Sequence, residues 1–444
     1  MNDNSKEKLI LITAAWLGCF ANYTEKIYSA YYHGTEASPI QFIVSCLFVS
    51  TILMMPSLIA GIFCNIKFTR FVATGTFIYF IYWFLATYKL IPYSNISTKS
   101  VFVFLIIALL YVLVRFCGEL FWRKTGRIFM VMFISLLIST PTISFFQTVT
   151  TIKPTLSVER IFKVPPKAVV VIIFDELSPE MMPIFRPALT NGEHVLHIGT
   201  TLKAGKNTIN AIPSMLTSMR HDDVVVCGST RLCGENPFDM SYLKAAHSSI
   251  DVVGFYHPYC AIQGLRSCWS PEKSNSNKYS LMNLNYFLSL LSSLPVIHRV
   301  FNINVTDDQL NTKNLRNSIA KTALTAPIWT EGGLLYIHQF LPHPAGLKPY
   351  HLKDEYNSNV LDAAGFITTL KNQLQNNFGA DYALIITTDH PLRTEFWCAS
   401  DAYNKADCNK DLPAETENIP FMVSAPKQLA VQIPETNVGI FSNP

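Results

Sequence analysis

The side chains best suited to catalysis follow three apolar runs in the part of the chain after Lys167. They are Asp175 and Glu176 after Ala168–Phe174, His338 and His343 after Gly333–Ile337, and Asp389 and His390 after Tyr382–Thr387. Carboxylate oxygens and imidazole nitrogens are hard ligands that suit a divalent cation. Taken singly, each is better explained as a helix cap, a turn residue or a surface histidine. Their shared position after successive runs favours a metal site.

The stretch Gly205–Ser218, with the sequence GKNTINAIPSMLTS, offers a hydroxyl nucleophile in Thr208. Apolar residues at helical spacing follow it, namely Ile209, Ile212, Leu216 and Met219. Because proline is tolerated only in the first helical turn, Pro213 predicts a helix that begins near Ala211 or Ile212. Thr208 then lies in the preceding loop, where free N–H groups and the helix dipole favour a phosphate. Without other support, a capping role for Thr208 is the better explanation.

The apolar runs predict the strands that position these side chains. They are Ala168–Phe174, Asp251–Phe255, Gly333–Ile337 and Tyr382–Thr387. The first is continuously apolar and β-branched, as in a parallel strand covered on both faces. The segment Asn357–Asn377, between the last two runs, has the pattern of an amphipathic helix. Strands alternating with helices predict an α/β domain with a mainly parallel sheet, in which ligands bind beyond the carboxyl ends of the strands.

The first part of the chain differs in composition. The 444 residues are 49% hydrophobic and 15% charged, and long apolar runs are concentrated before about Gln147. Runs with the roughly 20 residues that a spanning helix needs are Ile40–Cys64, Phe71–Ile91, Val101–Cys117 and Ile128–Phe146. The shorter run Leu9–Ala21 is a short span, an uncleaved anchor or a cleaved signal peptide. We therefore predict an α-helical transmembrane domain over 1–147 with about five spans, a linker over 148–167 and a soluble domain over 168–444.

Basic residues predict the orientation of these spans. The denser set, close to the span ends, is Lys6, Lys8, Lys67, Arg70, Arg123, Lys124 and Arg127. The opposite side has Lys26, Lys89 and Lys99. The denser set is expected to be cytoplasmic, which places everything after Gln147 outside the membrane. The expected location is a bacterial inner membrane, with the soluble domain in the periplasm. The net charge of +4 is too small to indicate a nucleic-acid partner.

Cysteine spacing agrees with an oxidising compartment. Six cysteines of the soluble part form close neighbours, namely Cys227 with Cys233, Cys260 with Cys268, and Cys398 with Cys408. Local pairs of this kind favour three short-loop disulfides, although six cysteines allow roughly 15 connectivities. A zinc ribbon is the competing interpretation, but the gaps do not repeat the usual short spacing.

Together these motifs resemble the alkaline phosphatase/sulfatase superfamily. They are more similar to its membrane-anchored branch, which contains phosphoethanolamine transferases and lipoteichoic acid synthases. Those families place several apolar spans ahead of an extracytoplasmic sulfatase-like domain, with a metal-bound threonine before a proline-containing helix start. The matching residues are Glu176 with Asp175 beside it, Thr208 with Pro213, His343, and Asp389 with His390. The later segment Ile419-Pro420-Phe421-Met422 resembles the strand that usually follows the metal site.

The chain also departs from those families. Catalytic sulfatases carry a cysteine or serine for conversion to formylglycine at the position of Ala211, so sulfatase chemistry is disfavoured. The transferases that modify lipid A continue after the Asp-His pair with glycine and a further histidine. Here the chain continues Pro391-Leu392-Arg393, which disfavours lipid A as the acceptor. The ligand set that remains is Glu176, Thr208, Asp389 and His390.

The resemblance implies a metal-dependent transferase. A divalent metal, zinc or else manganese, would activate the Thr208 hydroxyl toward a phospholipid donor of phosphoethanolamine or phosphoglycerol type. A phosphothreonine intermediate would then pass the headgroup to a lipid or glycan acceptor. The resemblance makes Asp175 a ligand or an orienting residue and His343 an acid and base. Substrate contacts are expected from Lys206, His338 and His343, with a solvated Lys206 at least as well supported.

Two other functions fit the same residues. In a hydrolase of this fold, water would resolve the intermediate. In a non-catalytic sulfatase-like module, the domain would bind a glycan or assemble envelope components, a function that Ala211 suits and that the intact ligand set opposes.

Overall fold

The computed structural model describes residues 6–13, 66, 70, 124, 127, 128, 131, 154–190, 194–226, 230–234, 236–271, 307–345, 351–399, 403, 411–426 and 429–443. The chain divides into two compact units, and the described residues from 154 onward belong to the second. The four long predicted spans lie outside the described residues, apart from residues 128 and 131, and Leu9–Ala21 is described only to residue 13. Within the described part, no helix has the length and apolarity needed to cross a bilayer.

In the first unit, the structure describes a helix over residues 6–13 and an ion pair between Glu7 and Arg70. The guanidinium of Arg70 donates to both carboxylate oxygens of Glu7, at 2.6 and 2.9 Å, and both residues are buried. Glu7 and Arg70, which are 63 positions apart in sequence, are therefore neighbours within this unit.

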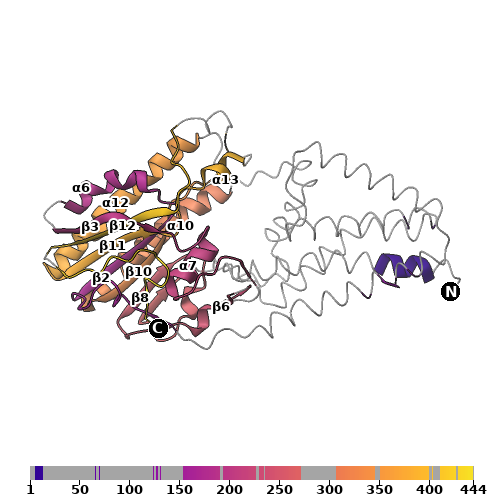
Figure 1. Ribbon diagram of the computed structural model, residues 1–444, viewed down its shortest axis with the longest axis horizontal. Helices are drawn as coiled ribbons and strands as arrows, with labels where there is room; N and C mark the ends of the chain where they lie inside the picture. Colours follow the sequence, from indigo (N-terminus) through magenta and orange to yellow (C-terminus); the bar gives the residue numbers. More distant parts are fainter. Residues whose placement is uncertain are drawn as a thin grey trace. The chain divides into compact units, whose positions relative to one another are not determined.

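A seven-stranded sheet forms the centre of the second unit (Figure 1). Its strands, in spatial order, are β3 (His194–Leu202), β12 (Asn418–Ala425), β11 (Tyr382–Thr388), β2 (Ala168–Asp175), β10 (Gly333–Pro342), β8 (Ile250–Gly254) and β9 (Ser267–Trp269). β12 is antiparallel to both neighbours, and the other pairs are parallel. The predicted α/β domain with a mainly parallel sheet is confirmed, including a strand at Ile419–Met422.

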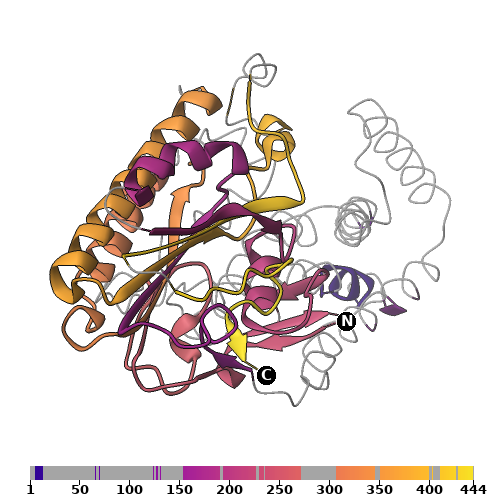
Figure 2. The same cartoon turned by 60° about the vertical axis from the view of Figure 1, so that its left-hand side comes forward.

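Helices cover both faces of this sheet (Figures 1 and 2). α6 (Met182–Thr190), α10 (Asp307–Ala323) and α12 (Leu352–Phe378) lie on one face, and α7 (Thr208–Leu216) lies on the other. The alternating residues Val170, Ile172 and Phe174 of β2 join the core on the α12 side. Because strand side chains alternate, Asp175 points to the opposite face, where α7 lies. The alternation of side chains along β2 therefore places the Asp175 carboxylate on the same face of the sheet as Thr208.

The start of α7 differs from the prediction. The helix begins at Thr208, three residues before Ala211, and Pro213 lies inside it. The Asn207 side chain accepts a hydrogen bond from the Asn210 N–H at 3.2 Å. This cap gives a partner to a backbone N–H of the first helical turn, which precedes the proline. Pro213 then removes only the hydrogen bond to the Ile209 carbonyl. Thr208 is consequently in the first helical turn rather than in a loop.

Smaller elements complete the second unit. They are the sheet of β1 (Thr155–Leu156), β7 (Lys244–Ala245) and β13 (Ser442–Asn443), the sheet of β4 (Val224–Val226), β5 (Arg231–Gly234) and β6 (Phe238–Asp239), and the short helices α11 (Ile328–Glu331) and α13 (Thr394–Ala399). β1 lies within the segment predicted as a linker. α12 begins at Leu352, five residues before the predicted Asn357, and ends one residue beyond the predicted Asn377.

One predicted disulfide is present in full, between Cys260 and Cys268. Cys233 and Cys398 are also disulfide-bonded. Their predicted partners, Cys227 and Cys408, lie outside the described residues. The zinc-ribbon interpretation is therefore wrong for these described cysteines, because their sulfurs are oxidised and cannot act as thiolate ligands.

Candidate metal centre

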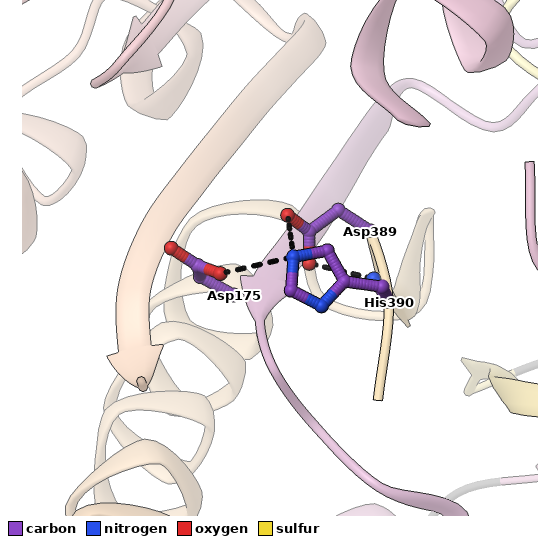
Figure 3. A group of neighbouring side chains, drawn as sticks. All are labelled: Asp175, Asp389 and His390. Carbon is purple, nitrogen blue, oxygen red and sulfur yellow. Dashed lines mark hydrogen bonds and ion pairs between the residues drawn. The ribbon is translucent and has the colours of Figure 1, made fainter. Parts of the chain in front are cut away.

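Three predicted site residues meet at the carboxyl ends of two neighbouring strands. β2 and β11 are parallel with Phe174 opposite Thr388, so Asp175 and Asp389 leave the sheet side by side. His390 Nε2 lies 3.4 Å from Asp389 Oδ2 and 3.8 Å from Asp175 Oδ1 (Figure 3). One ligand atom from each of the three residues lies within 4.8 Å of the others, and all three side chains are buried.

Backbone and hydroxyl groups hold this corner in place. The Thr388 hydroxyl donates to the Phe174 carbonyl at 2.7 Å, and the Asp389 N–H donates to the same oxygen at 3.1 Å. Asp389 Oδ1 accepts from the His390 N–H at 2.7 Å and from the Glu176 N–H at 3.3 Å. These bonds occupy one oxygen of Asp389 and direct Oδ2 toward Asp175 and the imidazole.

The remaining atoms of the corner fit a cation. Asp175 Oδ1 and Asp389 Oδ2 are buried and make no hydrogen bond to any described residue. His390 Nδ1 lies 3.0 Å from the Pro391 carbonyl, so in the neutral imidazole a proton on Nδ1 leaves a lone pair on Nε2. Two carboxylate oxygens and a nitrogen lone pair facing one another are unfavourable in a buried site unless a positive charge lies between them.

The pKa values of the two carboxylates reflect the same crowding of negative charge. Burial, followed by the charges of Asp389 and Glu176, raises the pKa of Asp175 well above its ordinary value. Burial also acts to raise the pKa of Asp389, but the charges of His390 and His338 and the hydrogen bonds to the carboxylate hold it below the ordinary value. Two carboxylates in such proximity do not both ionise without a cation, so a divalent ion would be held most tightly when both protons are released.

Thr208 adds a hydroxyl oxygen to this corner. Its Oγ1 lies 3.3 Å from His390 Nε2, and the side chain is buried. The His257 imidazole holds the Thr208 backbone, with Nε2 3.0 Å from the Thr208 carbonyl. A Cβ at Gly205 would lie 2.5 Å from the Ala211 nitrogen, so only glycine lets the preceding loop pack this closely on α7. The structure thus brings Thr208, Asp175, Asp389 and His390 together.

Glu176 is placed differently from its neighbour. It adopts a left-handed φ of 66°, which turns its side chain away from the line of β2. Its Oε1 accepts from Arg393 Nε at 2.5 Å, and its Oε2 accepts from Trp397 Nε1 at 2.7 Å. The Tyr356 hydroxyl donates to the Glu176 carbonyl at 2.8 Å and stabilises this turn. The carboxylate that the sequence favoured as a ligand is engaged by a cation and an indole, whereas Asp175 belongs to the group of side chains that could hold a metal.

The predicted acid and base, His343, lies in an aromatic setting. Its ring is 4.5 Å from the Phe340 ring and 5.2 Å from the Trp397 ring, measured between centroids. Burial lowers the pKa of His343, although the Glu176 charge acts in the opposite direction. Arg316 Nη2 donates to the His343 carbonyl at 2.7 Å and fixes the backbone there. Near neutral pH this imidazole is uncharged and suited to accept a proton.

The other two predicted substrate contacts, His338 and Lys206, have very different surroundings. His338 is fully buried, with Nδ1 2.8 Å from the Tyr259 hydroxyl and 3.2 Å from the Phe255 carbonyl. Burial lowers its pKa to about 4, despite the opposing charge of Asp389. Lys206 is exposed in the loop before α7. Contacts from either residue to a substrate remain predictions.

Three residues of this region carried no usable sequence signal. His257 and Tyr256 follow β8, where the sequence indicated only a strand, and Tyr256 adopts a left-handed φ of 70° that is strained for a bulky residue. Although Tyr256 is 37% exposed, desolvation by its surroundings, followed by the charge of Asp175, raises the pKa of its hydroxyl to about 12. Trp397 follows Arg393 by four residues, and only this spacing and the position after the Asp-His pair mark the two as partners.

Comparison with known proteins adds only structural similarity. No protein-family model and no curated protein sequence matches the chain. It is similar to the integral membrane lipooligosaccharide phosphoethanolamine transferase EptA of Neisseria meningitidis, with a TM-score of 0.35 and 11% identity over 93% of this chain and 88% of that one. It is also similar to the periplasmic domain of Escherichia coli EptC, with a TM-score of 0.31 and 10% identity over 62% and 77% of the respective chains. A Vibrio parahaemolyticus protein of the alkaline phosphatase superfamily has a TM-score of 0.30 and 11% identity over 68% and 70%. At these identities and TM-scores, the similarity carries no weight for the reaction.

Proposed function

We propose that the chain is a metal-dependent transferase that moves a phospholipid headgroup to an envelope lipid or glycan acceptor through a phosphothreonine at Thr208. The headgroup is of phosphoethanolamine or phosphoglycerol type. Residues for a divalent metal are Asp175, Asp389, His390 and Thr208. Their oxygen-rich set with one nitrogen suits zinc and also manganese.

The observation that carries this proposal is the position of the Thr208 hydroxyl. It is buried in the first turn of α7, 3.3 Å from His390 Nε2, which faces two carboxylate oxygens that make no hydrogen bond to protein atoms within the described part of the chain. A capping threonine has no need of such surroundings, because Asn207 already caps the helix. A hydroxyl held against a cation-binding corner is the arrangement expected for an activated nucleophile.

Each step follows from the residues of the site. A bound divalent metal would supply positive charge that lowers the pKa of the Thr208 hydroxyl. The Thr208 hydroxyl loses its proton as Oγ forms a bond to phosphorus, the bond to the diacylglycerol oxygen breaks, and that oxygen takes up a proton. In the second step the bond between Thr208 Oγ and phosphorus breaks, Oγ regains a proton, and phosphorus bonds to the acceptor oxygen, whose hydroxyl loses its proton. Neutral His343 is suited to accept that proton, and the N–H groups at the start of α7 offset the phosphate charge.

The ion pair between Glu7 and Arg70 in the first unit supports a membrane-anchored enzyme. The basic segments near residues 6–8 and 67–70 were assigned to the same membrane side, and the Glu7–Arg70 ion pair makes residues of these segments neighbours. Two segments joined in this way belong on one side of a bilayer. An enzyme acting on phospholipid donors needs such an anchor at the leaflet that presents them.

The test is intact and peptide mass spectrometry of the full chain purified with phospholipid, compared with Thr208→Ala and Thr208→Ser. We expect a mass increment on Thr208 that is lost in the alanine variant and regained at a lower level with serine. The size of the increment identifies the headgroup. Elemental analysis of the same samples should find one type of divalent metal in all three proteins.

The outcomes separate the competing functions. An adduct that persists in water and is discharged by an added lipid or glycan alcohol supports the transferase. An adduct discharged equally fast by water alone indicates the hydrolase. A chain with neither metal nor adduct would be a non-catalytic module, and the proposal would fail.

A further inference from the structure

Arg393 lies beside the candidate metal centre, and its contacts use only part of its hydrogen-bonding capacity. Its Nε donates to the buried Glu176 carboxylate at 2.5 Å, and the guanidinium stacks 4.7 Å from the Phe396 ring centroid. The side chain is 27% exposed. A guanidinium has five N–H donors, and in the described part of the chain only the Nε donor makes a hydrogen bond. The Nη edge is therefore available to another ligand.

The guanidinium is fixed rather than free to swing. Glu176 holds Nε from one side, while Trp397 donates to the second oxygen of the same carboxylate and fixes its orientation. Phe396 covers the face of the guanidinium. A planar donor held at Nε and at one face presents its remaining donors in a defined direction, which is the requirement for recognising tetrahedral oxyanions.

The charge of Arg393 acts on the metal corner. Among the influences that raise the pKa of Arg393 are the carboxylates of Asp175 and Asp389, after the closer Glu176. Arg393 in turn acts to lower the pKa of Asp175 and of His343. The guanidinium thus shares one low-dielectric enclosure with the ligand carboxylates, although its ion pair is with Glu176.

Counting charges shows why further hydrogen-bond donors are needed there. Asp175 and Asp389 together would balance one divalent metal, and Arg393 balances Glu176. A phosphodiester brings a further negative charge, and attack by Thr208 concentrates more negative charge on the non-bridging oxygens. A single metal with two carboxylate ligands leaves little net positive charge for these oxygens, whereas a fixed arginine edge supplies donors aimed at them.

Building on the proposed transferase, we propose that Arg393 is a catalytic residue whose Nη donors bind the non-bridging oxygens of the phosphoryl group attacked by Thr208. Glu176 and Trp397 are its positioning residues. The site is then specific for an anionic tetrahedral phosphoryl group, and a neutral phosphotriester lacks the charge that Arg393 recognises.

The test uses the full chain in detergent, loaded with its metal, and two probes, inorganic orthovanadate and inorganic phosphate. Calorimetric titration of Arg393→Gln should show binding of both anions weakened by about 100-fold, and Arg393→Lys by about tenfold because one fork-shaped pair of donors is lost. Arg186→Gln, which removes an exposed arginine from α6, is the matched control and should bind as wild type. Elemental analysis should find equal metal in all four proteins.

A double variant distinguishes anion binding from mere neutralisation of Glu176. Arg393→Gln with Glu176→Gln removes both charges of the buried pair, so no uncompensated charge remains to unfold the site. The proposal expects the double variant to bind vanadate about 100-fold more weakly than wild type. Wild-type affinity in a metal-loaded double variant would overturn it, because Arg393 would then serve only as the counter-ion of Glu176.

The remaining outcomes are also decisive. A wild-type chain that holds metal and binds neither anion overturns the role of Arg393 while leaving the metal centre intact. A wild-type chain without metal and without a Thr208 adduct refutes the transferase itself. Normal vanadate binding by Arg393→Gln, with metal present, contradicts only the role of Arg393.

Discussion

The two carboxylates at the end of β2 belong to regions that are built in different ways. We call Asp175, Thr208, Asp389 and His390 the floor of the site, and Glu176, His343, Arg393 and Trp397 its rim. Floor residues leave adjacent elements of regular structure, are buried, and are held by backbone groups, such as the Phe174 carbonyl that accepts from Asp389. Rim residues touch one another through side chains, as Arg393 and Trp397 do on Glu176. In the proposed function, the sheet would determine where a metal is held, and the side-chain network of the rim would determine what surrounds the substrate.

The largest expected difference between floor and rim lies in metal content. Asp175→Asn removes an anionic oxygen from the corner, so we expect metal in the purified protein to fall to background and the rate of adduct formation to fall by about 1,000-fold or more. Glu176→Gln alters only the rim and should retain metal near the wild-type level. Elemental analysis and quench-flow measurement of Thr208 modification check both variants.

The opposite result would reverse the assignment of the two carboxylates. Metal lost in Glu176→Gln and kept in Asp175→Asn would make Glu176 the ligand, as the sequence motif suggests. Circular dichroism serves as the control for folding, because Glu176→Gln leaves the charge of Arg393 partly buried and without its partner.

This contrast explains how much the sequence could predict. The apolar runs predict the strands, and the rule that ligands gather at carboxyl ends of parallel strands brings Asp175, Asp389 and His390 together in advance. The alternation of side chains along β2 also favours Asp175 over Glu176. Val170, Ile172 and Phe174 face α12, so the next residue, Asp175, points to the α7 face. The motif favoured the other carboxylate, because a left-handed φ at Glu176 is not visible in a sequence.

The rim was not predictable for a physical reason. Its contacts join residues 217 and 221 positions apart, and no local period records them. Pro391-Leu392-Arg393 was recognised only as a departure from a familiar pattern. The helix start at Thr208 was missed for a related reason, because the strength of the Asn207 cap outweighed the position of Pro213.

A second prediction concerns the dependence of the unfolding free energy on pH. His338 is fully buried on β10, and burial lowers its pKa to about 4 from the ordinary value of 6.5. Between those values the folded state binds fewer protons than the unfolded state, so stability is complete above about pH 6.5 and is lost as the pH falls toward 4. The shift corresponds to roughly 3 kcal/mol of unfolding free energy. His338→Gln should remove most of this dependence.

Denaturant unfolding with a chelator, followed by tryptophan fluorescence at several pH values, checks this prediction. The chelator removes the contribution of metal release. Asp175 has a raised pKa and contributes in the opposite direction, but it is present in both proteins and cancels in the difference. Parallel pH profiles of wild type and His338→Gln would show that His338 does not set the acid sensitivity.

A smaller effect is expected at the rim. Trp397→Phe keeps an aromatic ring beside His343 but removes the N–H that donates to Glu176. Oε2 of the buried Glu176 carboxylate then lacks this hydrogen-bond donor. The loss lowers the unfolding free energy by about 1 to 3 kcal/mol. We expect a lower denaturant midpoint with unchanged metal content. Loss of metal in this variant would show that the rim also supports the floor and would remove the distinction between them.

The smallest expected effect tests whether the floor depends on backbone contacts alone. His257 holds the Thr208 carbonyl through Nε2 at 3.0 Å, so a side chain after β8 anchors the nucleophile's own backbone. His257→Phe removes this hydrogen bond, worth about 1 kcal/mol, and should slow Thr208 modification by about fivefold to tenfold in a single turnover. Metal content and vanadate affinity should stay at the wild-type level, because neither the ligand atoms nor the Arg393 edge is changed. His257→Gln keeps an N–H donor and should recover part of the rate. A phenylalanine variant as fast as wild type would mean that the imidazole acts by packing against Tyr259, its neighbour at 5.9 Å, and not by holding the carbonyl.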